Sequence, residues 1–453
     1  MESETVALIL RPLLGSPGGA ILKDTLVDLL LFKLAHFMLR ILHTADWHLG
    51  QTFRGDSREF EHEAVFGSLL TIVQQHQIDT LLIAGDIFDS QHPSGESQAL
   101  FYRMLARLHA ARPEMNTIVI AGNHDAAGRL EAPHPLLDSF KVHIVGNVRR
   151  IDGRVDCSRH LLTLKDTAGD PYLHILALSY PTAACLPPIP SSEIEEEESN
   201  VIRSVRSLYD ELYQALSPKL ASLPFVVMGH LHVRGGIESE GAERRILVGG
   251  QHAVPLDVFP AGASYVALGH LHKAQSVGSN GAIRYSGSLI PLSATEQPYR
   301  HGVTLVTIDG AAVITEHVEI PRPVPFLSFG THAEGVRISE LADHLQKLGL
   351  PADLATHLQP FLQIRLSRQG LGSGFREQVD RIASSFPVRI VEARPDPLPE
   401  QIAQAVAHAT PLRSLTHIEP EEMFLRAFRR ASGADATEDH LKVFHRAYAE
   451  AQE

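Results

Sequence analysis

The chain is poor in cysteine, since only Cys157 and Cys185 occur among its 453 residues and neither belongs to a CxxC pair. This excludes a disulfide framework and a thiolate zinc site, and it fits a reducing, cytoplasmic compartment. The chain also lacks a GxxxxGK[ST] loop, with which P-loop enzymes hold nucleotide phosphates. Any nucleotide hydrolysis would therefore have to come from a partner protein.

Positive charge and long apolar runs are scarce as well. The net charge of −13 argues against a protein that coats nucleic acid through bulk electrostatics. The apolar stretch from Leu22 to Leu39 is interrupted by charged side chains, so no membrane span is expected. Residues 1–37 start with acidic residues, unlike a secretory signal. We interpret them as an N-terminal extension, either an upstream start or a dispensable appendage.

The overall composition is typical of a globular protein, with 44% hydrophobic and 21% charged residues. From Leu39 onward, short aliphatic or β-branched runs alternate with helical stretches, which is typical of an α/β fold. Helices are predicted at Glu61 to Gln75 and at Ser97 to Ala111. Strands are predicted at Arg40 to Thr44, Thr80 to Ala84, Thr117 to Ala121, Leu173 to Leu178, Phe225 to Met228 and Tyr265 to Leu268.

A domain boundary is predicted at the segment IPRPVPF, from Ile320 to Phe326, because three prolines in seven residues disfavour a helix or a central strand. Beyond it, the pattern predicts a second, small α/β domain with a helix around Ser339 to Leu348, a strand at FLQIRLS, a helix at FREQVDRIASSF and a strand at VRIVEAR. The remainder after ARPDPLPE is predicted to be helical. We therefore divide the chain into residues 1–37, a main domain at 38–320, a small domain at 321–399 and C-terminal helices at 400–453.

Five of the predicted strands end in small residues followed by side chains that bind metals. The motifs are ADWHLG, AGDIFD, AGNHD, MGHLH and LGHLH. Because ligands bind beyond the carboxyl ends of strands in open α/β sheets, these side chains are expected to converge. The candidate ligands are Asp46, His48, Asp86, Asn123, His230, His270 and His272.

Carboxylate, amide and imidazole ligands without thiolates suit manganese, iron or zinc. Asp86 is the natural bridge, since one carboxylate can give an oxygen to each of two ions. Two such ions activate a water and clamp the oxygens of a phosphoryl group, which predicts phosphoester hydrolysis. Each motif alone would be weak evidence in a chain with 26 histidines, and we interpret His43 as an ordinary packed residue. The five motifs in series favour a metal site.

The series DxH, GD, GNHD, GH and GHxH resembles the calcineurin-like metallophosphoesterases. Within them, LHTADWHLGQ, AGDIFDSQHPS, ALGHLHKAQ and YSGSLIPLSATE are similar to SbcD-type subunits of bacterial DNA exonucleases. The resemblance covers residues 38 to about 320. It implies a four-layer αββα sandwich in which two sheets lie between helices.

The resemblance also implies two metal positions that hold Mn²⁺ ions. The first would use Asp46, His48, Asp86 and His272, and the second would use Asp86, Asn123, His230 and His270. His124 would lie near the scissile phosphate, to stabilise the transition state or to protonate the leaving oxygen. Asp125 would orient His124. His232 remains an alternative to His230.

For the later segments, the resemblance implies a capping domain that selects DNA ends and C-terminal helices that bind an SbcC-type ATPase. It also implies a homodimer within a heterotetramer. The apolar residues of those helices would then form the partner-binding face: Phe424, Leu425, Phe428, Leu441, Phe444 and Tyr448. From their pattern alone, packing on their own domain is the alternative.

The leading functional hypothesis is a subunit that degrades double-stranded DNA from its ends and cuts hairpins or single strands internally, in repair or recombination. Two alternatives remain open at this stage. One is an enzyme for small phosphoesters or phosphoproteins, against which GDIFDS lacks the arginine of the phosphoprotein phosphatase motif. The other is a non-catalytic scaffold at DNA ends, against which every expected ligand position is filled.

Overall fold

The computed structural model describes residues 38–182, 184–187, 200–220, 223–239, 253–279, 281–331 and 334–396, together with 424, 425, 428, 437, 440, 441, 443 and 444. Two compact units are present, Met1–Arg394 and Pro395–Glu453. The N-terminal extension, Tyr448 and most of the acidic segment after Pro187 lie outside the described residues. No helix in the described ranges is long and apolar enough to cross a membrane.

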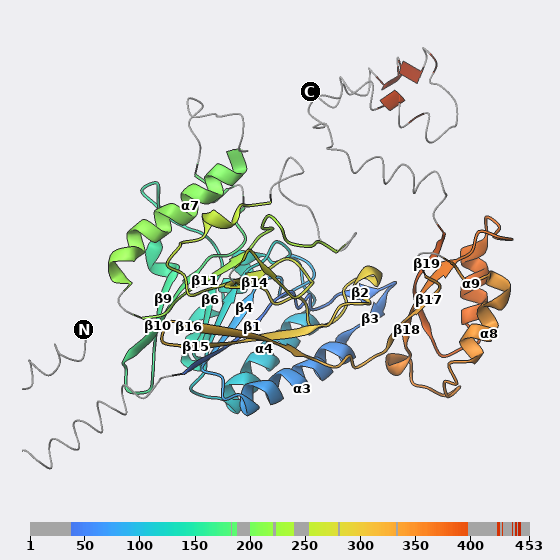
Figure 1. Ribbon diagram of the computed structural model, residues 1–453, viewed down its shortest axis with the longest axis horizontal. Coiled ribbons are helices and arrows are strands. Elements are labelled where there is room, and N and C mark those ends of the chain that lie inside the picture. The colour runs from blue at the N-terminus through green and yellow to red at the C-terminus, as the bar shows by residue number, and fades with distance from the viewer. Residues whose placement is uncertain are drawn as a thin grey trace, which may run out of the picture. The chain divides into compact units, whose positions relative to one another are not determined.

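Two six-stranded sheets form the centre of the first unit (Figure 1). In spatial order, the first sheet contains β16 (Ala312–Glu319), β15 (Gly302–Asp309), β1 (Leu39–Thr44), β4 (Thr80–Ala84), β5 (Asn116–Ile120) and β6 (Val142–Val145). The second contains β13 (Gln275–Val277), β14 (Ile283–Tyr285), β12 (Tyr265–Gly269), β11 (Phe225–His230), β10 (Pro171–Ala177) and β9 (Leu161–Lys165). All six strands predicted from the sequence are confirmed.

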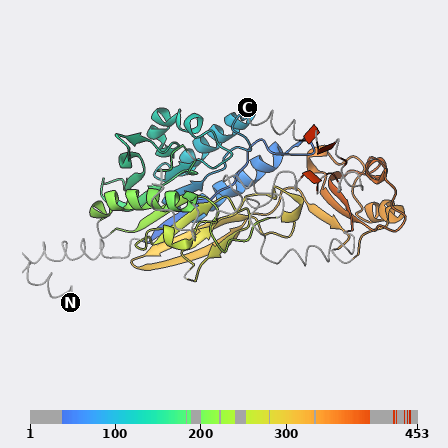
Figure 2. The same cartoon turned by 90° about the horizontal axis from the view of Figure 1, so that it is seen from above.

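Helices cover the outer face of each sheet. The first sheet packs against α3 (Glu59–Gln75) and α4 (Gly95–Ala111), and the second packs against α7 (Asn200–Leu216). Figure 1 shows α7 on one side of the paired sheets and α3 and α4 on the other, and Figure 2 shows the same elements from above. The four-layer αββα sandwich is therefore confirmed. Shorter elements connect the layers: the hairpins β2 (Thr52–Phe53) with β3 (Asp56–Ser57) and β7 (Arg150–Ile151) with β8 (Arg154–Val155), and the helices α5 (Ala127–Glu131) and α6 (His134–Leu137).

The central strands are buried on both faces, which explains their nearly continuous apolar sequences. In β4, Leu82 and Ala84 face the layer between the sheets, whereas Leu81 and Ile83 face the helices. In β11, Val226 and Met228 likewise enter the inter-sheet layer. Alternate residues of one strand thus serve two separate cores.

A three-stranded sheet follows the main sandwich (orange in Figure 1). Its strands are β17 (Phe326–Phe329), β18 (Phe361–Leu366) and β19 (Arg389–Pro395), accompanied by α8 (Leu341–Gln346) and α9 (Phe375–Ala383). They share a hydrophobic cluster that includes Leu341, Leu362 and Val379. We call residues 321–394 the cap. The sequence pattern predicted α8, β18, α9 and β19 but missed β17, which begins at the end of the proline-rich segment.

Candidate metal centre

All seven candidate ligands follow strands whose carboxyl ends meet between the two sheets. Strands β1, β4 and β5 run parallel to one another in the first sheet, and β11 and β12 are parallel in the second. Asp46 and His48 follow β1, and Asp86 follows β4. Asn123 follows β5, His230 ends β11, and His270 and His272 follow β12. The expected convergence beyond the strand ends is therefore present.

The backbone at this edge adopts an uncommon conformation. Asp46, His48, Asp86 and His270 have φ values of 55°, 46°, 49° and 104°. A positive φ is rare and strained for residues with a Cβ, and such strain persists where the surrounding fold enforces it. Here it turns each chain segment sharply after its strand, so that the side chains point back into the shared crevice.

Two glycines allow the strand ends to approach closely. A Cβ on Gly122 would lie 2.1 Å from Oδ1 of Asp86, and one on Gly269 would lie 2.0 Å from the carbonyl oxygen of Ala84. Neither position can accept a side chain without moving the backbone or a candidate ligand. The glycines of AGNHD and LGHLH are thus required by packing around the site.

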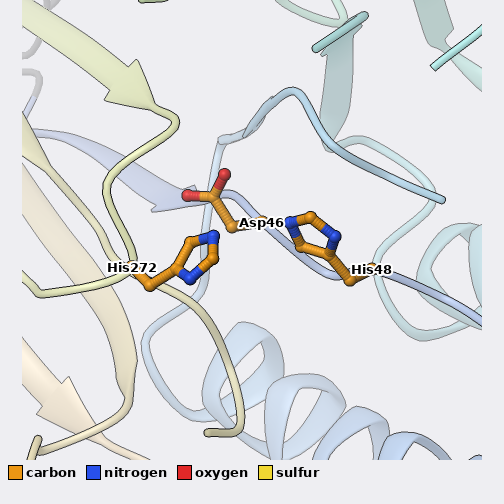
Figure 3. A group of neighbouring side chains, drawn as sticks. All are labelled: Asp46, His48 and His272. Atoms are coloured by element: carbon orange, nitrogen blue, oxygen red, sulfur yellow. The ribbon is translucent and has the colours of Figure 1, made fainter. Parts of the chain in front are cut away.

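The first cluster consists of Asp46, His48 and His272 (Figure 3). One potential ligand atom from each residue lies within 4.8 Å of the others. The rings of His48 and His272 are 5.2 Å apart and nearly perpendicular. All three residues are buried. Two segments far apart in the sequence therefore bring a carboxylate and two imidazoles together.

The second cluster lies around Asn123. Its Oδ1 is 3.1 Å from Nε2 of His230 and 3.0 Å from Nδ1 of His270. The other ring nitrogen of His230 donates to the carbonyl oxygen of Ala84 at 2.8 Å, which fixes the orientation of this ring. Two imidazoles and an amide oxygen therefore face one point.

Asp86 lies between the two clusters. Its Oδ2 is 3.6 Å from Nε2 of His48 and 3.3 Å from Nε2 of His230. Its Oδ1 accepts the backbone N–H of His124 at 2.8 Å. One carboxylate oxygen thus faces an imidazole of each cluster, which is the position that a bridging ligand requires.

The residues fit divalent cations. Oδ2 of Asp46 and Nε2 of His48 are buried and have no hydrogen-bond partner among the described residues. Leaving a buried polar atom unpaired costs about 1–3 kcal/mol, and a metal ion would satisfy both atoms. The carboxylate, amide and imidazole set suits such ions. We conclude that this crevice is a site for divalent metal ions.

Burial and mutual charge shift the titration of the cluster. Burial alone would raise the pKa of Asp86, but the adjacent His230 and His48 lower it below its ordinary value. Burial alone would lower the pKa of His230, but the Asp86 carboxylate raises it to about 9. The pKa of His270 is lowered by burial and by the nearby charge of His230. A carboxylate facing several imidazoles is the charge arrangement of a metal-binding site.

His124 lies beside the first cluster. Its ring is 4.7 Å from the ring of His48, and its Nδ1 donates to the carbonyl oxygen of Asp89 at 2.8 Å. This hydrogen bond holds the ring and places the lone pair of the neutral imidazole on Nε2.

The expectation that Asp125 orients the ring of His124 was wrong. The Asp125 carboxylate accepts backbone N–H groups from Ile87, Phe88 and Gly122 at 3.1, 3.0 and 2.8 Å. Asp125 therefore ties together the segments that follow β4 and β5. It acts on the shape of the crevice rather than on one imidazole.

His230 and His232 occupy different environments. His230 is fully buried beside Asp86 and Asn123. The side chain of His232 is 25% exposed and lies 3.3 Å from Glu238. The geometry therefore favours His230 as the ligand.

Two acidic residues at the site were missed by the sequence reasoning. Oδ1 of Asp89 accepts from Nδ1 of His48 at 3.2 Å, and Oε1 of Glu296 accepts from Nδ1 of His272 at 2.9 Å. Carboxylates in this position hold metal-binding imidazoles in one tautomer. Both lie in recognised motifs, AGDIFD and YSGSLIPLSATE, but nothing in the sequence pairs either of them with a particular histidine.

His43 belongs to the fold rather than to the site. It is fully buried in β1, and its Nδ1 hydrogen-bonds with the hydroxyl of Tyr265 at 2.8 Å. This agrees with its interpretation as a packed residue.

Comparison with known proteins agrees with the class that this fold and site define, a metal-dependent phosphoesterase. Residues 39–274 match the family described as calcineurin-like phosphoesterase, and residues 334–432 match a family described as type 5 capsule protein repressor C-terminal domain. The chain is 41% identical to the D subunit of nuclease SbcCD from Rhodobacter capsulatus, over 86% of this chain and 94% of the other. Proteins with the same name match from Bacillus subtilis (35% identity, 59% and 66% coverage) and Escherichia coli K12 (28% identity, 86% and 92% coverage).

The chain therefore belongs to the calcineurin-like phosphoesterase family, within its SbcD-type branch.

Proposed function

We propose that this chain is the nuclease subunit of an SbcCD-type complex and hydrolyses DNA phosphodiester bonds. The observation that carries the proposal is Asp86, whose Oδ2 faces His48 of one cluster and His230 of the other. The names of the similar proteins supply the substrate class. Exonuclease action on duplex ends and endonuclease action on hairpins or single strands are part of the proposal.

In this proposal two divalent ions, Mn²⁺ in the working enzyme, occupy the two clusters. Asp46, His48 and His272 hold the first position, and Asn123, His230 and His270 hold the second. Asp86 is shared by both. When bound, such a pair of ions supplies Lewis-acid activation of water and phosphate.

His124 is proposed as the catalytic imidazole. The hydrogen bond from its Nδ1 to Asp89 directs Nε2 away from that carbonyl oxygen, and its backbone N–H anchors it to Asp86. In hydrolysis, water adds to phosphorus while the bond to the leaving oxygen breaks, and that oxygen must gain a proton. A fixed imidazole beside the clusters is suited to deliver it or to stabilise the transition state.

We retain the division into residues 38–320 for the nuclease domain, 321–399 for the capping domain and 400–453 for partner binding. The hydrophobic cluster formed within the cap supports treating residues from 321 onward as a domain of their own. Within the C-terminal unit, the Phe424 ring lies 5.8 Å from that of Phe428 and stacks on that of Phe444 at 4.6 Å. A paired aromatic face of this kind is suited to an SbcC-type coiled coil. A homodimer within a heterotetramer completes the proposed assembly.

The proposal is tested by Mn²⁺-dependent degradation of linear duplex DNA, compared with hydrolysis of bis-p-nitrophenyl phosphate. Both assays use wild type and Asp86→Ala, with and without the partner ATPase. We expect wild type to degrade DNA and Asp86→Ala to lose both activities. Cleavage of the small ester alone, even with the partner present, would favour a small-molecule phosphoesterase. Binding to DNA ends without cleavage of either substrate would favour a scaffold.

A further inference from the structure

We propose that the cap controls the first metal position, held by Asp46, His48 and His272, more strongly than the second. The inference rests on the proposed two-metal function. It names a form of regulation: contact between the cap and the nuclease domain sets the geometry of one half of the metal centre.

Glu296 is the first link in this connection. It is fully buried, its Oε1 accepts from Nδ1 of His272 at 2.9 Å, and its Oε2 accepts the backbone N–H of Leu292 at 2.9 Å. Ser293 donates to the same Oε1 at 3.2 Å. The carboxylate therefore fixes the ring of His272 and is itself fixed by the segment 291–299. Any movement of this segment must move the ring.

The same segment is attached to the cap. The side-chain amide of Gln297, next to Glu296, donates to the carbonyl oxygen of Phe326 in β17 at 3.1 Å. Ala294, two residues before Glu296, packs in a buried cluster with Phe53, Val324, Phe326 and Phe361. Glu296 thus lies in a short turn, Ala294–Glu296, that contacts the metal site on one side and the cap on the other.

A second route joins His48 to the cap. The hairpin β2–β3 begins four residues after His48, and its Phe53 packs edge-on against Phe361 of β18 at 5.1 Å between ring centres. Arg58 lies 4.1 Å from the ring of Phe53 and pairs with Glu61 at 2.7 Å. This hairpin therefore extends from one candidate ligand into the same aromatic cluster.

The segments that form these two routes are also hydrogen-bonded to each other. Gln51 donates to the carbonyl oxygen of Leu292 at 3.2 Å and accepts from Arg58 at 2.9 Å. Arg58 also donates to the carbonyl oxygen of Pro291. Outside this core, Arg54 at the tip of the hairpin forms a bidentate pair with Asp380 of α9 at 3.2 and 3.3 Å. The segments behind His48 and His272 form one packed unit with the cap.

The second position has different supports. Among the described residues, the side chains of Asn123, His230 and His270 contact one another, His230 also contacts Ala84 and Asp86, and the backbone N–H of His270 donates to Asp46. None of these groups belongs to the cap. Displacing the cap would therefore perturb two ligands of the first cluster directly, and it would reach the second only through the shared Asp86 and the contact of His270 with Asp46.

The test is a Mn²⁺ titration of the full chain, in which electron paramagnetic resonance measures free Mn²⁺. We expect wild type to bind two ions. Glu296→Gln should weaken one binding event roughly 10- to 100-fold, as loss of a partner behind a metal ligand does. Phe361→Ala and the milder Gln297→Ala should weaken the same event by roughly 2- to 30-fold. Glu211→Gln on α7, a carboxylate that contacts Arg150 and the backbone of Val155, is the matched control.

The affected position is identified in an Asn123→Ala background, where one ion remains. Adding Glu296→Gln there should weaken that remaining event. If Phe361→Ala and Gln297→Ala leave both affinities unchanged, or weaken both equally, the inference fails while the proposed function stands. If wild type binds no Mn²⁺, the inference and the proposed function fail together.

Discussion

His272 and Glu296 form a buried imidazole and carboxylate pair, with 2.9 Å between Nδ1 and Oε1. Burial alone would raise the pKa of Glu296, but the adjacent His272 lowers it below its ordinary value. Because Nδ1 donates to Glu296, the lone pair of the neutral imidazole is on Nε2, and the ring lies next to Asp46 and His48 (Figure 3). The metal centre is thus shaped by residues behind its ligands as well as by the ligands.

The two histidines of MGHLH can be separated by mutation. His230→Ala removes a buried imidazole from beside Asp86 and Asn123, so we expect loss of one Mn²⁺ and a fall in activity greater than roughly 10- to 100-fold. His232→Ala removes a partly exposed contact with Glu238, worth less than about 1 kcal/mol, and we expect it to leave two bound Mn²⁺ ions. Metal stoichiometry and DNA cleavage measured side by side decide the matter. Equal losses for the two variants would contradict the assignment.

His124 should be separable from metal binding. His124→Asn removes the imidazole but keeps the backbone N–H that donates to Asp86. We expect kcat for DNA cleavage to fall roughly 10²- to 10⁴-fold, the usual contribution of a positioned acid or base. Two Mn²⁺ ions should still bind with nearly wild-type affinity. A variant that lost an ion instead would make His124 a ligand.

Two arginines near the cap predict different effects on stability. Arg58 is buried and forms a bidentate pair with buried Glu61 at 2.7 and 2.8 Å. Arg58→Ala leaves the Glu61 carboxylate buried without its charged partner and should lower the free energy of unfolding by about 3–5 kcal/mol. The pair between Arg54 and Asp380 is half exposed, so Arg54→Ala should cost less than about 1 kcal/mol. Urea denaturation in EDTA measures both, and a comparable loss in the two variants would refute the distinction.

Acid should destabilise the protein partly through His43. Burial, with Arg284 nearby, lowers the pKa of His43 to about 3. Between that value and the ordinary pKa near 6.5, the unfolded chain binds a proton that the folded chain does not. The free energy of unfolding should therefore fall as pH drops from 6.5 toward 3, by up to about 1.4 kcal/mol per pH unit for this group.

The check is a double variant, His43→Leu with Tyr265→Phe, which removes both partners of the buried hydrogen bond. In EDTA its free energy of unfolding should depend less steeply on pH between 6 and 4 than that of wild type. Parallel curves for the two proteins would exclude His43 as a source of the acid sensitivity.

The sequence predicted six central strands because each is an almost continuous apolar run, and five of these runs end in a ligand motif. It missed β15 (Gly302–Asp309), although Val303, Leu305 and Val306 are buried and the strand pairs with β1. No ligand motif follows this strand. Strand β16 was missed for another reason: its residues are alternately exposed and half-buried at the edge of the sheet, so its apolar signal is weak.

By itself the sequence determined which side chains can bind metal and the order in which the strands carry them, because both are local properties. Tertiary structure alone decided which oxygens and nitrogens meet. Only folding brings together the segments that place Asp86 between His48 and His230. The same is true of the pairing of Glu296 with His272 and of the backbone hydrogen bonds that Asp125 accepts from two loops. These distances follow from how two sheets pack, and no spacing within a single strand encodes them.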